Sequence, residues 1–416
     1  MGDIERSWLT NPSRRAAIAR VAGLMAASPI ASAAAQIDPR PMGEHRRALS
    51  LAEMQSAFDF EPLFFGNVSQ SVYDYTGHAD GSEWTLRRNR QAFGWVDILA
   101  ARNPVPASQV DLSSTILGYN SKFPIWMAPT AQMVALNPDG EMGMFRACTA
   151  ASNTLMILSA NTGTQVEQVA PASPGGTLWA QYYPQENLTT TQASIDRLQN
   201  AGCQSITVTI DQTASYYERT LQDRNLGGRG GRGAAPGGRG GAAAGPAPAP
   251  AALTGAARYR IGAGRIWYTW QYIDAVRKMV KGPMIIKGID QPEDALLAIQ
   301  HGADSIVVSN HGGRSMDYGA STLENLPAIV AAVNGKVPIL FDSGIRRGSD
   351  IFKALALGAN GVCLGRAARW GLAAFGQAGA QRIIEMLQQE LVQTAAAAGC
   401  AKLSDINRSK IKVNFV

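Results

Sequence analysis

The feature that most constrains the fold is a repeat that begins near residue 120. Short apolar runs rich in β-branched residues each end in a polar or small residue, and a helix-like segment follows each run. Most runs start 22 to 33 residues apart, which leaves room for one strand, one helix and two loops. There are eight such runs, at residues 124–130, 154–159, 177–183, 205–211, 283–288, 305–310, 338–343 and 361–365.

Eight strand–helix units indicate an α/β fold with a parallel sheet, and this number favours a closed (β/α)8 barrel, also called a TIM barrel. A doubly wound open sheet is the structural alternative. The chain has 416 residues, of which 46% are hydrophobic, and this composition supplies a large core. We expect residues 121–416 to form the barrel and residues 36–120 to form an N-terminal helical cap.

One interval between runs is much longer than the others, because the fourth and fifth runs start 78 residues apart. Within it, residues 227–252 are almost wholly Gly, Ala, Pro and Arg. Such a segment buries too little apolar surface to offset the entropy lost on ordering, so we expect a disordered insert after the fourth strand. It is interpreted first as a tolerated surface insertion. The alternative is a basic arm that makes a peripheral membrane contact or touches an acidic electron acceptor.

The positive charge of the chain is localised. The formal net charge is +6, of which residues 1–35 supply +2 and residues 227–252 supply +3, so the rest of the chain is nearly neutral. This distribution argues against nucleic-acid binding, which requires a broad basic face. The four cysteines form no CxxC pair and lie near no His-rich cluster, so we expect no metal site. Cys363 lies in an apolar run and is expected to be buried.

The first 35 residues resemble an export signal. Arginines at positions 14 and 15 precede a mildly apolar stretch, and the alanines at 33–35 resemble a cleavage site. The pattern is similar to a twin-arginine signal, although Ala17 stands where a large apolar residue is usual. We expect a periplasmic protein whose mature chain begins near Gln36, which N-terminal sequencing would test. The alternative is a cytoplasmic protein with an N-terminal extension.

Active sites of such barrels lie at the C-terminal ends of the strands. The seventh run ends in Asp342-Ser343-Gly344-Ile345-Arg346, and the eighth ends in Gly365-Arg366. Glycines let the backbone approach an anion, and the arginines can neutralise it. These two ends therefore predict a site for a ligand that carries a phosphate, without specifying a flavin.

Lys287, at the end of the fifth run, has three interpretations: a nucleophile that forms an imine, a surface lysine, or a fixed cation beside a cofactor. A strand end argues against the surface, and nothing nearby indicates imine chemistry. We therefore interpret Lys287 as electrostatic support for an electron-rich cofactor.

The sixth run ends in Ser309-Asn310-His311-Gly312-Gly313-Arg314, and the fourth ends in Asp211. A histidine in a strand-end loop can act as a base, and a carboxylate can orient it and stabilise its imidazolium form. An arginine three residues later can bind a carboxylate. Together, His311, Asp211 and Arg314 suit proton abstraction from an α-hydroxy acid.

These motifs also carry a family resemblance. From roughly Tyr73 to the C-terminus, outside residues 227–252, the chain resembles the FMN-dependent 2-hydroxy-acid oxidases and dehydrogenases, which include glycolate oxidase, lactate oxidase, and L-lactate and mandelate dehydrogenases. The most specific segments are 84–90, 309–314 and 342–354. The resemblance implies FMN as cofactor, oxidation of an L-2-hydroxy acid to a 2-keto acid, and a homotetramer. Oxygen, a quinone or a cytochrome would accept the electrons.

The resemblance also assigns roles to residues. His311 would take a proton, with Asp211 behind it. The substrate would be bound by Tyr75, Tyr183, Arg314 and, as a second carboxylate clamp, Arg219. The flavin ring and ribityl chain would be lined by Pro129, Thr130, Ala131, Ser159, Gln181, Thr209, Lys287 and Ser309. The ribityl and phosphate end would be held by Asp342, Gly344, Arg346, Gly365 and Arg366.

Three positions depart from the family pattern. The loop 212–219 lacks the usual Pro- and Arg-containing sequence, Asn161 stands where glycolate oxidases have Trp, and Ser343 replaces a usual glycine. Two other functions stay open. One is another flavin barrel that binds phosphate, such as an isomerase, which the spacing of His311 and Arg314 disfavours. The other is a barrel that binds flavin or an acid without turnover.

Overall fold

The computed structural model describes residues 49–185, 187–211 and 269–415. Three predictions lie outside these ranges: the export signal at 1–35, the disordered insert at 227–252 and the role of Arg219. Within the described ranges, no helix combines the length and apolar character needed to cross a bilayer.

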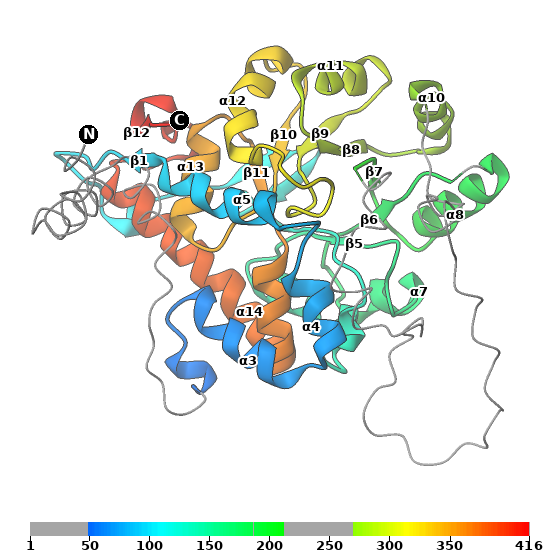
Figure 1. Ribbon diagram of the computed structural model, residues 1–416, viewed down its shortest axis with the longest axis horizontal. Coiled ribbons are helices and arrows are strands. Elements are labelled where there is room, and N and C mark those ends of the chain that lie inside the picture. Colours follow the sequence, from blue (N-terminus) through cyan, green and yellow to red (C-terminus); the bar gives the residue numbers. More distant parts are fainter. Residues whose placement is uncertain (1–48, 186, 212–268, 416) are drawn as a thin grey trace, which may run out of the picture. The chain divides into compact units, whose positions relative to one another are not determined.

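Eight parallel strands close into a barrel (Figure 1). Consecutive strands are neighbours, and the last strand pairs with the first through Val362–Ile125, Cys363–Trp126 and Leu364–Met127. The predicted (β/α)8 barrel is therefore confirmed, and the alternative of an open sheet is wrong. The strands are β4 (Ile125–Met127), β5 (Met156–Leu158), β6 (Leu178–Tyr182), β7 (Ile206–Thr209), β8 (Met284–Ile289), β9 (Ser305–Val308), β10 (Ile339–Phe341) and β11 (Gly361–Leu364).

A helix follows each strand in the described parts of the chain. These helices are α6 (Gly140–Ala150), α7 (Val166–Val169), α8 (Leu188–Asn200), α10 (Trp270–Met279), α11 (Pro292–Gln300), α12 (Thr322–Val333), α13 (Gly348–Ala356) and α14 (Arg366–Ala397). Helix α14 consists of two segments, because Phe375 and Gly376 leave the helical conformation and Gly376 has φ 60°. The first segment begins directly after β11 and lies beside the cavity described below.

The barrel interior is filled at its N-terminal end. Trp126 and Trp179 meet edge to face with ring centroids 5.2 Å apart, and Tyr119 packs against both rings. Tyr119 belongs to a hairpin formed by β2 (Ser114–Ile116) and β3 (Tyr119–Ser121), which directly precedes the first barrel strand. Because this end of the barrel is packed with side chains, the opposite end of the strands is left for a ligand.

Helices α3 (Phe60–Asn67), α4 (Gln70–Gly77) and α5 (Trp84–Gly94) precede the barrel, within the region expected to cap it. Phe60 of α3 packs edge to face on Phe375 of α14, and Arg90 of α5 pairs with Asp350 of α13 at 2.7 Å. After Gly94 this region adds strands rather than further α-helices. Strand β1 (Val96–Ile98) pairs antiparallel with the C-terminal strand β12 (Ile411–Val413), so the segment after α5 is joined to the last strand of the described chain.

Single turns of 3-10 helix complete the described elements. They lie at Leu51–Glu53, Ala57–Asp59, Ala107–Gln109, Met133–Ala135, Ala170–Ala172, Leu403–Asp405 and Arg408–Lys410.

The interior packing gives a stability prediction. Trp126→Ala would leave a cavity inside the barrel, because this side chain is fully buried. We expect a loss of about 3–5 kcal/mol, seen as a lower midpoint of denaturant unfolding followed by circular dichroism. Trp84→Ala is the matched control, because Trp84 is 45% exposed and lies outside the barrel. Equal losses in the two variants would contradict the importance of the interior packing.

Candidate active site

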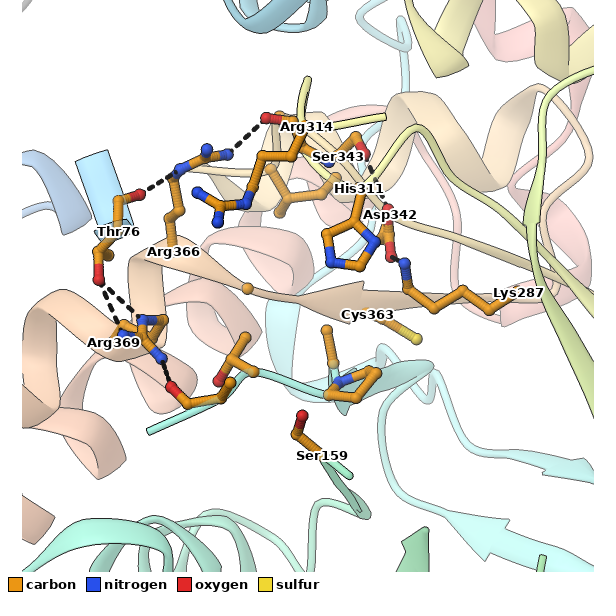
Figure 2. A pocket seen from close by; sticks show the side chains of 18 of the residues that line it. Thr76, Ser159, Lys287, His311, Arg314, Asp342, Ser343, Cys363, Arg366 and Arg369 are labelled. Atoms are coloured by element: carbon orange, nitrogen blue, oxygen red, sulfur yellow. Dashed lines mark hydrogen bonds and ion pairs between the residues drawn. The ribbon is translucent and has the colours of Figure 1, made fainter. Parts of the chain in front are cut away.

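A cavity of about 800 Å³, its open mouth included, lies at the C-terminal ends of the strands (Figure 2). Residues from the strand ends, from α4 and from the first turn of α14 line it. They are Tyr75, Thr76, Ala128, Pro129, Thr130, Ala131, Ser159, Tyr183, Lys287, His311, Gly312, Arg314, Asp342, Ser343, Gly344, Ile345, Arg346, Cys363, Gly365, Arg366 and Arg369.

A buried ammonium group lies at the bottom of this cavity. Lys287 Nζ donates to Ser309 Oγ at 2.8 Å, and it lies 3.6 Å from Asp211 Oδ2 and 3.5 Å from Asp342 Oδ2. Burial alone would lower the pKa of Lys287, but the two carboxylates raise it above its ordinary value. The group therefore stays protonated and supplies a fixed positive charge.

His311 and Asp211 form a hydrogen-bonded pair, with His311 Nδ1 2.8 Å from Asp211 Oδ1. Burial would raise the pKa of Asp211, but His311 and Lys287 outweigh it and hold this pKa below its ordinary value. Burial lowers the pKa of His311 to about 4, although Asp211 acts in the opposite direction. At neutral pH the pair is thus a carboxylate and a neutral imidazole. The Asp211 carboxylate accepts from Nδ1–H, which leaves the lone pair on Nε2.

The loop around His311 is held in a strained conformation. His311 has φ 59° and Ser343, in the neighbouring loop, has φ 83°, and both values are uncommon outside glycine. Hydrogen bonds fix these residues. The backbone N–H of His311 donates to Ser309 Oγ at 3.1 Å, and that of Gly312 donates to Ser343 Oγ at 3.0 Å. Ser343 Oγ in turn donates to Asp342 Oδ1, so the serine that replaces a usual glycine joins two strand-end loops.

The cap also supports this loop. The amides of Asn89 and Asn310 exchange two hydrogen bonds of 2.8 and 2.9 Å. A Cβ on Gly313 would lie 2.6 Å from the backbone nitrogen of Leu86, so only glycine fits where the loop passes α5. Helix α5 therefore sets the position of the histidine loop.

Two arginines link the cap to the histidine loop. Arg314 donates to the carbonyl oxygen of Tyr75 at 2.6 Å, and its guanidinium carbon lies 4.8 Å from the centre of the Tyr75 ring. Arg366 donates to the carbonyl oxygens of Thr76, Gly312 and His78 at 2.6 to 2.9 Å. The side chain of Arg366 thus contacts three backbone carbonyl oxygens and also lines the cavity, so its contact with a phosphate stays a prediction.

The loops after β10 and β11 form a cradle suited to a phosphate. A Cβ on Gly344, which has φ 91°, would lie 2.5 Å from the Asn89 carbonyl oxygen, whereas nothing lies within 4 Å of a Cβ on Gly365. Arg346 packs 4.4 Å above the Trp370 ring and faces the same cavity. The N-terminus of α14 follows Gly365 directly. Backbone N–H groups at a helix N-terminus and a buried guanidinium are ordinary ligands of phosphate.

The strand ends at and beside the other end of the cavity fit a flavin ring. Among the residues that the structure describes, Thr130 Oγ1, Gln181 Nε2 and Thr209 Oγ1 are buried without a hydrogen-bond partner. Leaving such atoms unpaired is costly, which indicates a ligand with polar atoms along its edge. The isoalloxazine ring of FMN carries nitrogen and oxygen atoms along one edge, so these residues and the phosphate cradle together fit FMN.

The structure brings most predicted site residues to one place. Gln181, Thr209, Ser309 and Asp211 do not line the cavity but lie at the same strand ends, where Asp211 and Ser309 contact the lining residues His311 and Lys287. Sequence reasoning missed Thr76, Cys363 as a lining residue, and Arg369. The signal for Arg369 was its spacing, because a residue three positions after Arg366 lies on the same side of a helix. Cys363 is buried, as predicted.

Comparison with known proteins identifies the family. Residues 66–413 match the family model described as FMN-dependent dehydrogenase. The chain belongs to this family. It is 35% identical to glycolate oxidase 3 of Arabidopsis thaliana and 33% identical to glycolate oxidase of Spinacia oleracea, and each match covers 87% of this chain and 97% of the relative. A crystal structure of mandelate oxidase with (S)-2-phenylpropionate has a TM-score of 0.74 and 31% identity, and covers 87% of this chain and 100% of that one.

The family membership confirms the predicted resemblance and the predicted cofactor, FMN. It also confirms the predicted enzyme class, FMN-dependent oxidation of 2-hydroxy acids.

The phosphate cradle gives a binding prediction. Arg346→Met should weaken FMN binding about 10- to 100-fold, because a hydrogen bond to a charged group contributes about 1.5–3 kcal/mol. Flavin fluorescence during titration of the apoprotein measures the Kd. Arg347→Met is the matched control, since Arg347 pairs with Glu390 at 2.9 Å, outside the cavity. Arg346 has no role at the phosphate if the two variants bind FMN equally well.

Proposed function

We propose that this enzyme oxidises an L-2-hydroxy acid to the 2-keto acid with His311 as the base. The observation that carries this proposal is the hydrogen bond between His311 and Asp211, because the His311 side chain lines the same cavity as Arg314, Tyr75 and Lys287. A base, a carboxylate clamp and a fixed cation beside one cavity are the groups that this reaction requires.

Each residue has a defined task in this proposal. The substrate carboxylate binds the side chains of Arg314 and Tyr75, while Tyr183 contacts the hydroxyl region of the substrate. The oxidation removes two protons and two electrons from the substrate. His311 Nε2 takes one proton, and the ionised Asp211 stabilises the imidazolium that results. When bound, FMN would accept the two electrons together with the other proton. Lys287 supplies a positive charge that does not depend on the state of His311.

The arrangement of charges favours proton transfer once substrate is bound. Besides burial, the positive charge of Arg314 contributes through space to the low pKa of His311. A carboxylate on Arg314 neutralises that charge, and the pKa of His311 then rises. Substrate binding thereby makes the base stronger at the moment when it has to accept a proton.

The test of this proposal is reduction of the bound flavin. Purified holoenzyme is mixed anaerobically with L-lactate, glycolate and (S)-mandelate, and loss of flavin absorbance near 450 nm is followed by stopped flow. Bleaching by at least one acid supports the proposal, and no bleaching across a wide panel of 2-hydroxy acids contradicts it. Reoxidation of the bleached enzyme with oxygen, a soluble quinone or a cytochrome then identifies the electron acceptor among the three proposed classes.

The His311–Asp211 pair gives a pH prediction. Protonated His311 cannot accept a proton, so kcat/KM should fall as the pH drops through about 4, where burial places the pKa of His311, and it should be level above about pH 6. Asp211→Asn removes the charge that stabilises the imidazolium, and we expect kcat/KM to fall by about 10²- to 10⁴-fold.

Asp274→Asn is the matched control for this variant. Asp274 lies 2.8 Å from His301 Nδ1, in a pair of the same geometry that does not line the cavity. Similar losses of kcat/KM in the two variants would rule out a specific role for Asp211.

A further inference from the structure

One arginine of the cavity has no role in the function proposed above. Arg369 lies in the first turn of α14 and is only 3% exposed, yet it lines the cavity. Its Nη2 donates to Thr76 Oγ1 at 2.8 Å, and its Nη1 donates to the carbonyl oxygen of Ala131. Figure 2 shows Arg366 and Arg369 both directed at Thr76, on the side of the cavity away from Lys287.

The charge of Arg369 lacks a close counterion. Within the described part of the chain, no carboxylate pairs with Arg369, and its hydrogen-bond acceptors are the neutral oxygens of Thr76 and Ala131. Glu141 acts on it only as a more distant charge, and that carboxylate already accepts from Met133 and Thr164. Burial of a cation is costly unless an anion accompanies it. Burial accordingly lowers the pKa of Arg369.

Other cations at this end of the barrel have identified partners within the described structure. Arg90 and Arg88 form ion pairs with Asp350 and Glu324, at 2.7 Å each. Lys287 lies between two carboxylates, and Arg366 is engaged by three carbonyl oxygens. Arg369 resembles Arg366, because both are buried at the cavity wall and donate only to neutral oxygen atoms, whereas Lys287, Arg88 and Arg90 each lie beside a carboxylate. An anionic ligand would complete the surroundings of Arg369.

The position of Arg369 indicates which ligand this is. The phosphate cradle lies at Gly344, Arg346 and Gly365, whereas Arg369 shares the Tyr75 ring with Arg314. The guanidinium carbons of Arg314 and Arg369 lie 4.8 and 5.7 Å from the centre of this ring. The distance between the two guanidinium carbons is therefore no greater than the sum of these two distances. Arg369 therefore belongs to the side of the cavity assigned to the substrate.

We propose that Arg369 determines specificity by binding a second carboxylate of the substrate, so that the preferred substrate is a 2-hydroxydicarboxylic acid. This inference rests on the proposed function. The carboxyl carbons of a four- or five-carbon diacid lie about 4–5 Å apart. A guanidinium carbon lies about 4 Å from the carboxyl carbon that it binds. Two arginines within the distance set by the Tyr75 ring can therefore hold such a diacid at both ends.

The experiment compares substrates matched in length. With holoenzyme, kcat/KM is measured for L-malate and L-2-hydroxyglutarate, and for the monoacids L-2-hydroxybutyrate and L-2-hydroxyvalerate. We expect the wild type to prefer the diacids at least tenfold. Arg369→Gln should reduce this preference at least tenfold, chiefly through KM, and Arg369→Lys should retain part of it because the charge remains. Arg382→Gln is the control, since Arg382 lies on the same helix outside the cavity.

A binding measurement separates this inference from the proposed function. The oxidised holoenzyme is titrated with 2-oxoglutarate and with 2-oxovalerate, and the change in flavin absorbance gives each Kd. Tighter binding of the 2-oxodicarboxylate by the wild type, lost in Arg369→Gln, supports the inference even if no acid bleaches the flavin. Absence of bleaching by every acid of both kinds would instead count against the proposed function.

Three results would overturn the inference. One is a wild type that prefers monoacids. Another is an Arg369→Gln variant that loses activity equally toward both kinds of acid, which would mean that Arg369 only supports Thr76 and Ala131. The third is weaker FMN binding by this variant with unchanged substrate preference, because the charge would then serve the cofactor phosphate.

Discussion

The buried ammonium group of Lys287 is the interaction on which the site depends. It extends from β8 and contacts groups that follow three other strands: Asp211 after β7, Ser309 after β9 and Asp342 after β10. Transfer of an ion into a protein interior costs several kcal/mol, and only well-placed counter-charges offset that cost. Here the two carboxylates offset the burial of the ammonium group, and the ammonium group keeps Asp211 ionised. Together with His311, the ammonium group thus holds the pKa of Asp211 below its ordinary value.

A second constraint is conformational. His311 and Ser343 both adopt a left-handed backbone conformation, which costs of order 1 kcal/mol or more for residues other than glycine. The neighbouring loops offset this cost through Ser309 Oγ and Ser343 Oγ, which accept from the backbone of residues 311 and 312. Asn89 adds support from the cap. The position of the imidazole therefore depends on three segments far apart in the sequence.

The sequence was sufficient to predict the barrel, because strands buried on both faces read as short apolar runs and because polar residues mark their ends. Those ends also contained His311, Asp211 and Lys287, which the fold brings together. The contacts of the cap could not be predicted in this way. Thr76 meets Arg366 and Arg369 across about 290 positions of sequence, and no local pattern reports such a pairing. The contacts of Arg366 show the same limit, because the three carbonyl oxygens that it meets lie in segments far from it in the sequence.

The pairing of β1 with β12 has a consequence for the order of folding. Val96 opposes Val413, so this two-stranded sheet joins segments that lie on either side of the whole barrel in the sequence. Contacts between segments so far apart form slowly, because the chain loses loop-closure entropy before they add stability. Strands β1 and β12 therefore meet readily only when the barrel between them is compact, which makes their sheet a late contact in folding.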